Sequence, residues 1–402
     1  MINTIVSKID AQPEEGEEDK VHKDYQKFNM LYWLSQAAPN CLEVAKRLAL
    51  ITEKRTNFVP REHPDMDHWI SEASWLEPRS PVSVEELLGK RPLEWFDLFV
   101  TFKGVEFRGP DRDGLLLIIG EAVQEDFDWG KELTDLLICR VEPSSDLWKS
   151  IIRGWNGAKL SEEQWDYVLS ILNNEKLATN HSYHISDLLE HGIKKEEGGI
   201  PTGLLNKSNC VAQKVWATLR DKQDGETNDW LTRAINHPGG KLALYWLQAL
   251  SRTRKETDQK DEGLTQPYRM IFETIISENT EAGALGRVVL ASQLGFLFSV
   301  DEDWARKNIV PLLDWDRDVR QARQAWDGWL SWGRLSEPLL NELIPLFKKS
   351  FCHISSELKS ERDRFIEWIV GISIYWLDNP LLDGWLPDFL RSVEEEDRIN
   401  FA

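Results

Sequence analysis

Residues 309–326 read IVPLLDWDRDVRQARQAW, and no other stretch of the chain says more about how it folds. An apolar run that contains Pro311 leads into three alternating aspartates, and a second segment then begins at Val319 and carries small alanines and Trp326 at helical spacing. The aspartates are expected to accept hydrogen bonds from the free backbone N–H groups at the start of that second segment. We therefore predict two helices joined by a short acidic turn.

The same segment resembles a HEAT repeat. In that family a first helix containing a proline turns through an acidic residue into a second helix that opens with Val-Arg, here Val319 and Arg320. The resemblance implies antiparallel helix pairs that stack side by side as a solenoid. Because this is the one segment that matches well, the other pairs are expected to be degenerate copies.

Helical patterns continue along most of the chain. Ser161 and Gln164 form a capping-box pair, and apolar side chains at helical spacing follow it in residues 165–172. Ser83 and Glu86 form a second pair of the same kind. We expect an amphipathic helix to begin at each of these two places.

Two further apolar faces at helical spacing lie in residues 242–250 and 365–376. Pro238 and the two glycines after it mark a turn before the first of these segments. Strand-like alternation is limited to residues 100–107, where Gly104 interrupts it. Because turn signals recur every one or two helices, we predict an all-α fold, an α-solenoid-like and HEAT-like array of antiparallel helix pairs.

Composition divides the chain into three regions. Residues 11–20 hold five acidic side chains and no apolar anchor, and residues 1–20 are expected to form a flexible acidic leader. The Gly198-Gly199 break is expected to separate an N-terminal helical lobe, residues 21–198, from a C-terminal HEAT-like lobe, residues 199–402. The last residues fall within a continuing helical pattern, so we expect the C-terminal lobe to be truncated.

Charge and cysteine content restrict the kinds of partner. The chain has 68 acidic and 48 basic residues and a formal net charge of -20, which disfavours nucleic acid because phosphate binding depends on Lys and Arg. No apolar run approaches the roughly 18 residues of a membrane span, and the N-terminus lacks a secretory signal pattern. The four cysteines show no paired spacing. These features predict a cytoplasmic protein without nucleic-acid or membrane partners.

Nineteen tryptophans are spread along the chain. Their large apolar rings are expected to pack mainly between helices, where each indole N–H also needs a hydrogen-bond acceptor. A minority is expected to lie on a recognition surface, since Trp is enriched at binding hot spots. Trp329 and Trp332, near a turn, are the predicted exposed contacts for a protein partner.

A group of histidines offers a metal-dependent alternative. His181, His184 and His191 lie close together in sequence, Cys210 follows downstream, and imidazole and thiolate are ligands that zinc prefers. Zinc sites have tighter, paired spacing, however, so capping and surface roles for these histidines are the favoured interpretation. We predict neither a metal nor a cofactor.

Two other motifs lack a residue that their chemistry requires. Asp314, Asp316 and Asp318 mimic the start of an EF-hand loop, but the glycine and the final glutamate of that loop are missing. The run from Gly239 to Lys241 lacks the first glycine of a phosphate-binding loop and the Ser or Thr that follows its lysine. We exclude both calcium and nucleotide phosphate at these places.

Four stretches resemble a known bacterial family: residues 91–135, 236–251, 290–315 and 391–402. They are similar to the uncharacterised helical domain found C-terminal to sirtuin-like domains in bacterial anti-phage defence proteins. In such proteins the sirtuin-like part is expected to cleave NAD, and the helical part to sense infection, regulate or assemble. This chain has no sirtuin-like region, so NAD cleavage is not assigned to it. A fragment of a larger sirtuin-like protein, a truncated gene product and a stand-alone relative stay open.

We expect this chain to be a non-catalytic scaffold, sensor or regulatory module, not an enzyme, that binds an associated effector or a phage protein. A helical nuclease or metal-dependent hydrolase is the first rival, using either the His181 group or His68. Arg61 and His68 have the loose spacing of a helical RNase motif, although Pro64 between them disfavours a helix. A purely structural subunit that forms a homo-oligomer is the second rival.

Overall fold

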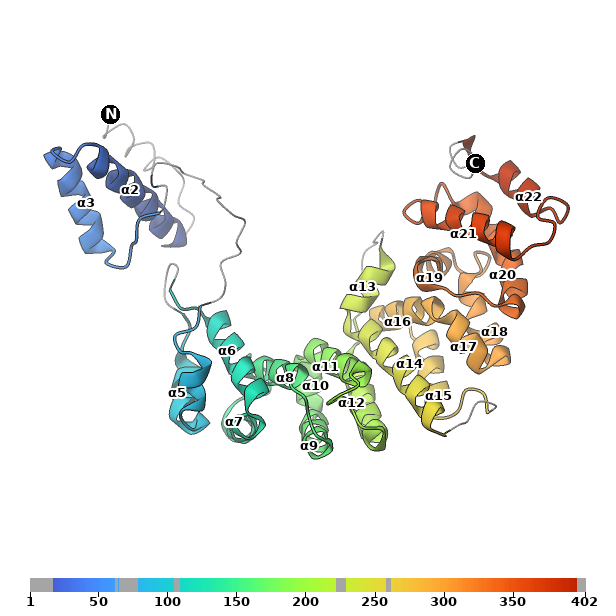
Figure 1. Cartoon of the computed structure of the whole chain (residues 1–402), viewed down its shortest axis with the longest axis horizontal. Helices are drawn as coiled ribbons and strands as arrows, with labels where there is room; N and C mark the ends of the chain where they lie inside the picture. The colour runs from blue at the N-terminus through green and yellow to red at the C-terminus, as the bar shows by residue number, and fades with distance from the viewer. Residues whose placement is uncertain are drawn as a thin grey trace. The chain divides into compact units, whose positions relative to one another are not determined.

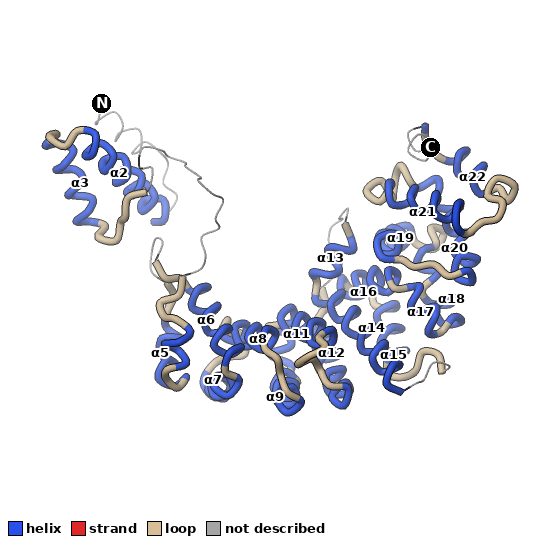
Figure 2. Tube along the Cα trace, viewed as in Figure 1, coloured by secondary structure: helices blue, strands red, loops and turns tan. Residues whose placement is uncertain are grey.

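The structure is a computed structural model, and it describes residues 17–61, 64, 79–104, 109–221, 229–257 and 262–395. Every regular element in these residues is a helix, as Figure 2 shows, and a single isolated backbone bridge joins Gly104 to Asp111. The predicted all-α class is confirmed. The strand-like alternation at residues 100–107 therefore gives no strand in its described part.

The chain divides into two compact units, residues 1–81 with 103–114 and residues 82–102 with 115–402. The described helices of the first unit are α2 (Glu17–Ala37) and α3 (Leu42–Lys54). Those of the second unit, with α6 beginning just before it, are α4 (Val84–Leu88), α5 (Pro92–Thr101), α6 (Arg112–Glu125), α7 (Phe127–Arg140), α8 (Leu147–Gly157), α9 (Glu162–Leu172), α10 (Glu175–Asn180), α11 (Ser182–Lys194), α12 (Leu205–Thr218), α13 (Trp230–Asn236), α14 (Pro238–Thr257), α15 (Tyr268–Ser277), α16 (Glu281–Ser292), α17 (Leu294–Val300), α18 (Glu302–Asn308), α19 (Val319–Trp332), α20 (Glu337–Ser350), α21 (Arg362–Tyr375) and α22 (Trp385–Ser392). Short 3-10 helices cover Thr202–Leu204, Val310–Leu313 and Phe351–His353.

The first unit has a small aromatic core of its own. The Tyr25 ring on α2 lies 5.1 Å from the Phe58 ring and 6.3 Å from the Phe28 ring, measured between centroids. The Tyr25 hydroxyl donates a hydrogen bond of 3.0 Å to the Val59 carbonyl. These contacts hold the segment after α3 against α2.

Helices of the second unit follow one another in a row, as Figure 1 shows. In chain order α8 contacts α11, α11 contacts α14, α14 contacts α16, and α16 contacts α19. A second set of helices packs on these, with α12 against α14 and both α13 and α15 against α16. This succession of neighbour contacts is compatible with the predicted solenoid.

Tryptophan rings join neighbouring elements, as predicted, because most of the described indoles are buried. Some indoles also connect elements through hydrogen bonds. The Trp129 indole N–H donates to the Lys90 carbonyl, and the Trp368 indole N–H donates to the Leu330 carbonyl. The expectation that every indole N–H finds an acceptor holds only in part. Buried indoles without an acceptor in the described residues are those of Trp148, Trp155, Trp230, Trp246 and Trp329.

Local capping signals predict helix starts correctly. Ser161 and Gln164 make both hydrogen bonds of a capping box at the start of α9, and Ser83 and Glu86 do the same for α4. Asp318 accepts a hydrogen bond of 3.0 Å from the Gln321 backbone N–H at the start of α19. These bonds join residues three apart, which is why the sequence reveals them.

The HEAT-like segment differs from its prediction in the first helix. The α-helix α18 ends at Asn308, and Pro311 lies in the separate 3-10 helix that follows. A proline lacks the backbone N–H that an α-helix would need from it, so the α-helix stops before Pro311. The second helix begins at Val319, as predicted.

The sequence predicted that Gly239 and Gly240 form a turn before a helix. That prediction is wrong, because both glycines lie in the first turn of α14. A Cβ atom at Gly240 would lie 2.0 Å from the Ala234 carbonyl oxygen, and one at Gly239 would lie 2.7 Å from the Cα of Ala282. Backbone packing therefore requires glycine at both positions. Helix α14 consequently lies directly against α13 and α16.

The predicted boundary at residue 198 does not coincide with the division between the two units. Trp165 donates to the Gly198 carbonyl at 2.9 Å, and Arg252 donates to the Ile200 carbonyl at 2.8 Å. These bonds tie residues on both sides of the glycine pair into the second unit. Residues 1–16 of the predicted leader lie outside the described residues. Its last four residues, 17–20, belong to helix α2.

Among the described helices, none has by itself both the length and the apolar character that crossing a bilayer requires. Helices α16 and α17 together reach this length and apolar character, but the chain bends by 73° between them. Every residue of α16 after Glu281 is buried, and the helix packs against other helices of the second unit. That burial is typical of a central packing helix.

Candidate functional site

The two predicted contact residues have opposite environments. Trp332 is 42% exposed at the end of α19, as predicted. Trp329 is fully buried, so the prediction that it is an exposed contact is wrong. Its ring lies 4.7 Å from the Trp368 ring and 5.3 Å from the Phe347 ring, because this face of α19 meets α21 and α20.

Trp332 lines a pocket of about 400 Å³, which we call the Trp332 pocket. One wall is α14, the second is the bend between α16 and α17, and the third is the segment that links α19 to α20. The lining residues are Leu247, Gln248, Ser251, Ser292, Gln293, Gly295, Phe296, Ser299, Trp332, Arg334, Leu335 and Ser336.

Close backbone packing positions the segment 333–336. A Cβ atom at Gly295 would lie 2.6 Å from the Arg334 carbonyl oxygen, so the segment rests directly on α17. Gly333 ends α19, and its N–H donates to the Trp329 carbonyl at 2.6 Å. The chain therefore turns beside Trp332, which leaves that ring and the Arg334 side chain at the pocket.

Several polar side chains of this pocket are not used by the fold, although the Ser292 and Ser299 hydroxyls donate to backbone carbonyls of their own helices. The side chains of Gln248, Gln293 and Arg334 make no hydrogen bond or ion pair with any described residue. Ser251 and Ser336 are likewise without a side-chain partner in the part of the chain that the structure describes. Their donors and acceptors are available to a bound molecule.

The charge of the Trp332 pocket contrasts with that of the whole chain. Arg334 is the one charged residue among those that line the pocket, and no Asp or Glu lines it. The chain as a whole carries a formal net charge of -20. The Trp332 pocket is therefore a locally basic place in an acidic protein.

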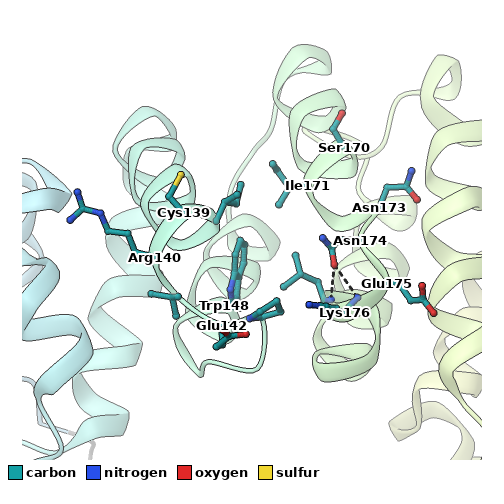
Figure 3. Close-up of a pocket in the computed structure, with 14 residues that line it drawn as sticks. Cys139, Arg140, Glu142, Trp148, Ser170, Ile171, Asn173, Asn174, Glu175 and Lys176 are labelled. Atoms are coloured by element: carbon teal, nitrogen blue, oxygen red, sulfur yellow. Dashed lines mark hydrogen bonds between the residues drawn. The ribbon is translucent and has the colours of Figure 1, made fainter.

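A larger pocket, of about 830 Å³, lies where the ends of α7 and α9 face each other (Figure 3). Two of its polar side chains serve the fold. Asn174 accepts hydrogen bonds from the Lys176 and Leu177 backbone N–H groups, drawn as dashed lines in Figure 3, and so caps α10. Ser170 donates to the Asp166 carbonyl.

This larger pocket also has no uniform charge, since two acidic and two basic residues line it: Arg140, Glu142, Glu175 and Lys176. The Trp148 indole in its wall is buried and has no acceptor among the described residues. We regard the pocket as a junction of helix ends. The Trp332 pocket is the stronger candidate because it combines an exposed indole with unpaired polar side chains and a charge of one sign.

Histidines predicted as a zinc alternative do not converge with Cys210. The His181 ring nitrogen Nε2 bonds to the Pro143 carbonyl at 2.7 Å, and the His181 and His184 ring centroids are 6.4 Å apart. Burial and the nearby Lys149 lower the pKa of His184 to about 4. Cys210 is exposed and lines a separate pocket with residues of α12.

The structure brings together a different group, Asp187, Glu190 and His191 on α11, whose potential ligand atoms lie within 4.8 Å of one another. The Lys241 ammonium on α14 donates to Asp187 at 2.7 Å and lies 3.4 Å from Glu190. Burial lowers the pKa of Lys241, but these carboxylates outweigh that effect and raise it. Lys194 pairs with Glu190 as well. The charge of the carboxylates is thus already compensated by protein ammonium groups.

The remaining motifs also have structural explanations where they are described. Asp314 and Asp316 accept hydrogen bonds from the Lys349 ammonium at 2.8 and 2.5 Å, so these carboxylates pair with a lysine of the fold. The Arg61 guanidinium lies 5.1 Å from the centre of the Tyr25 ring. His68, the other half of the predicted nuclease pair, lies outside the described residues.

Gln248, Gln293 and Arg334 were not anticipated from the sequence. They lie in three different segments, each some 40 residues after the one before it, so no local sequence spacing connects them. The one local signal is the polar turn after Trp332. Comparison with protein-family models, curated protein sequences and solved structures finds no match to this chain.

Proposed function

We propose that this protein is a non-catalytic helical scaffold that binds an extended segment of a protein partner in the Trp332 pocket. The observation that carries the proposal is a half-exposed indole in a pocket where Gln248, Gln293 and Arg334 have no side-chain partner within the described residues. A groove that combines one apolar anchor with unpaired hydrogen-bonding groups suits a peptide, which offers both side chains and backbone amides.

Each wall of the Trp332 pocket has a role in this proposal. The carboxamides of Gln248 and Gln293 can each donate to a peptide carbonyl and accept from a peptide N–H. Trp332 with Phe296 and Leu335 supplies an apolar surface for one side chain of the partner. Trp and Arg dominate binding energy in many protein interfaces, and a truncated hot-spot Trp typically weakens binding by about 2 kcal/mol or more.

The biological setting belongs to the same proposal. The resemblance to helical domains of anti-phage defence proteins favours a sensing or regulatory role, with an associated effector or a phage protein as the partner. The acidic composition favours a protein over a nucleic acid. A cytoplasmic setting agrees with cysteines that have no paired spacing.

The test is a selection from a displayed library of random dodecapeptides on the full chain. Binding of the selected peptides is then measured with Trp332→Ala and with Trp376→Ala as a matched control, since Trp376 is 41% exposed but does not line the pocket. We expect Trp332→Ala to weaken binding about 30-fold, which corresponds to about 2 kcal/mol. Trp376→Ala should leave it unchanged.

Two outcomes would overturn the proposal. The first is a selection in which no peptide depends on Trp332 more than on Trp376. The second is cleavage of RNA or DNA by the purified chain, with zinc or manganese present, that His184→Ala or His68→Ala abolishes. That result would establish the nuclease alternative in place of the scaffold.

A further inference from the structure

We infer that the segment bound in the Trp332 pocket is acidic, and that a carboxylate of the partner binds the Arg334 guanidinium. The inference rests on the proposed function and adds the chemistry of the ligand. It starts from the charge of the pocket, where Arg334 is the one charged lining residue. Arg334 is exposed and makes no ion pair or hydrogen bond with any described residue through its side chain.

Most arginines in the described residues make a side-chain hydrogen bond or an ion pair, and Arg334 is among the few that do not, with Arg140, Arg153 and Arg317. Carboxylates outnumber basic residues, and Arg306, for example, contacts three of them, Glu302, Asp303 and Glu342. The planar guanidinium binds a carboxylate through two parallel hydrogen bonds, which makes this pair stronger and more directional than one formed by lysine. A free arginine beside an exposed indole is thus matched by a carboxylate that lies next to an apolar side chain.

A carboxylate fits better than a phosphorylated side chain. Phosphopeptide sites generally use a cluster of arginines, because the phosphate carries nearly two negative charges. The Trp332 pocket supplies a single guanidinium, together with the neutral amides of Gln248 and Gln293 and the hydroxyls of Ser251 and Ser336. Those neutral groups match a peptide backbone on either side of one carboxylate.

The carboxylate could belong to an Asp or Glu side chain or to the C-terminus of the partner segment, and both present the same group to Arg334. The selected dodecapeptides distinguish the two sources. Each is synthesised with a free and with an amidated C-terminus, and in a form with Asn and Gln in place of Asp and Glu. Loss of binding in one form identifies the source of the carboxylate.

The decisive experiment measures the affinity of these peptides for the full chain and for three variants. Arg334→Gln removes the charge and should weaken binding at least tenfold, as expected for a hydrogen bond between charged groups. Arg334→Glu, used in a fresh selection, should enrich peptides containing Lys or Arg. Arg153→Gln is the control, since Arg153 is exposed on α8 and does not line the pocket.

The outcomes separate this inference from the proposed function. Peptides that depend on Trp332 but show no acidic preference and bind Arg334→Gln normally would refute the inference and leave the scaffold proposal standing. An absence of Trp332-dependent peptides would refute the scaffold proposal itself. Acidic peptides that lose affinity with Arg334→Gln, but not with Arg153→Gln, would support both.

Discussion

Asp327 is a buried carboxylate of α19 that is 2% exposed, and it accepts hydrogen bonds from the backbone N–H groups of Trp230 and Leu231. Burial, together with the negative charge of Glu361, raises the pKa of Asp327 to about 7. Ionisation therefore costs more in the folded than in the unfolded chain. The contribution of Asp327 to the free energy of unfolding should fall as pH rises from about 4, the ordinary pKa of aspartate, to about 7, and then level off.

Asp327→Asn removes this ionisation and keeps an oxygen that can accept the same hydrogen bonds. We expect the variant to be more stable than the wild type at pH 8, by on the order of 2–4 kcal/mol, with the difference vanishing near pH 4. Thermal melting followed by circular dichroism from pH 4 to pH 8 measures it. Asp128→Asn, at an exposed position of α7, should follow the wild-type profile. Parallel profiles for wild type and Asp327→Asn would contradict the prediction.

Substitution of a helical glycine by alanine tests how closely two helices pack. A Cβ atom at Gly240 would meet the Ala234 carbonyl oxygen at 2.0 Å, so Gly240→Ala must push α14 away from α13. Overpacking of this kind typically costs about 1–3 kcal/mol. The melting temperature should fall accordingly.

Gly371 provides the matched control, because it lies in α21 and a Cβ atom there would meet nothing within 4 Å. Gly371→Ala should raise stability by about 0.5–1 kcal/mol, since alanine favours a helix more than glycine does. If both substitutions raised the melting temperature, helix propensity and not packing would govern Gly240.

Helix starts could be predicted from the sequence, whereas the exposed faces of the helices could not. Ser83, Ser161 and Asp318 each bond a backbone group three residues away, so their effect is local and visible in the sequence. Trp329 and Trp332 both belong to the end of α19, yet only the second is exposed. Helices α20 and α21, which follow later in the chain, determine which face of α19 is covered.

The Trp332 pocket was predictable only through that one residue. Its polar lining comes from α14, from the α16–α17 bend and from the segment before α20, and tertiary packing alone brings these segments together. The unpaired state of Gln248, Gln293 and Arg334 is a property of the folded chain. The spacing of these residues in the sequence therefore does not predict that their side chains are unpaired.

The two compact units each have a core, which predicts that they lose structure separately. Tyr25, 2% exposed in the first unit, packs on Phe28 and Phe58. Phe272, fully buried in the second unit, lies 6.2 Å from the Trp304 ring. Truncating a large buried aromatic residue to alanine costs about 3–5 kcal/mol, which is enough to open a small unit.

Hydrogen exchange of the full chain, read by mass spectrometry of its peptides, distinguishes the units. We expect Tyr25→Ala to abolish protection in α2 and α3 and to leave α8 to α19 as protected as in the wild type. Phe272→Ala should act in reverse, lowering protection around α15 and α16 while α2 and α3 keep theirs. Because a shared core would transmit either substitution to both sets of helices, equal losses in the two units would show that the chain unfolds as one cooperative body.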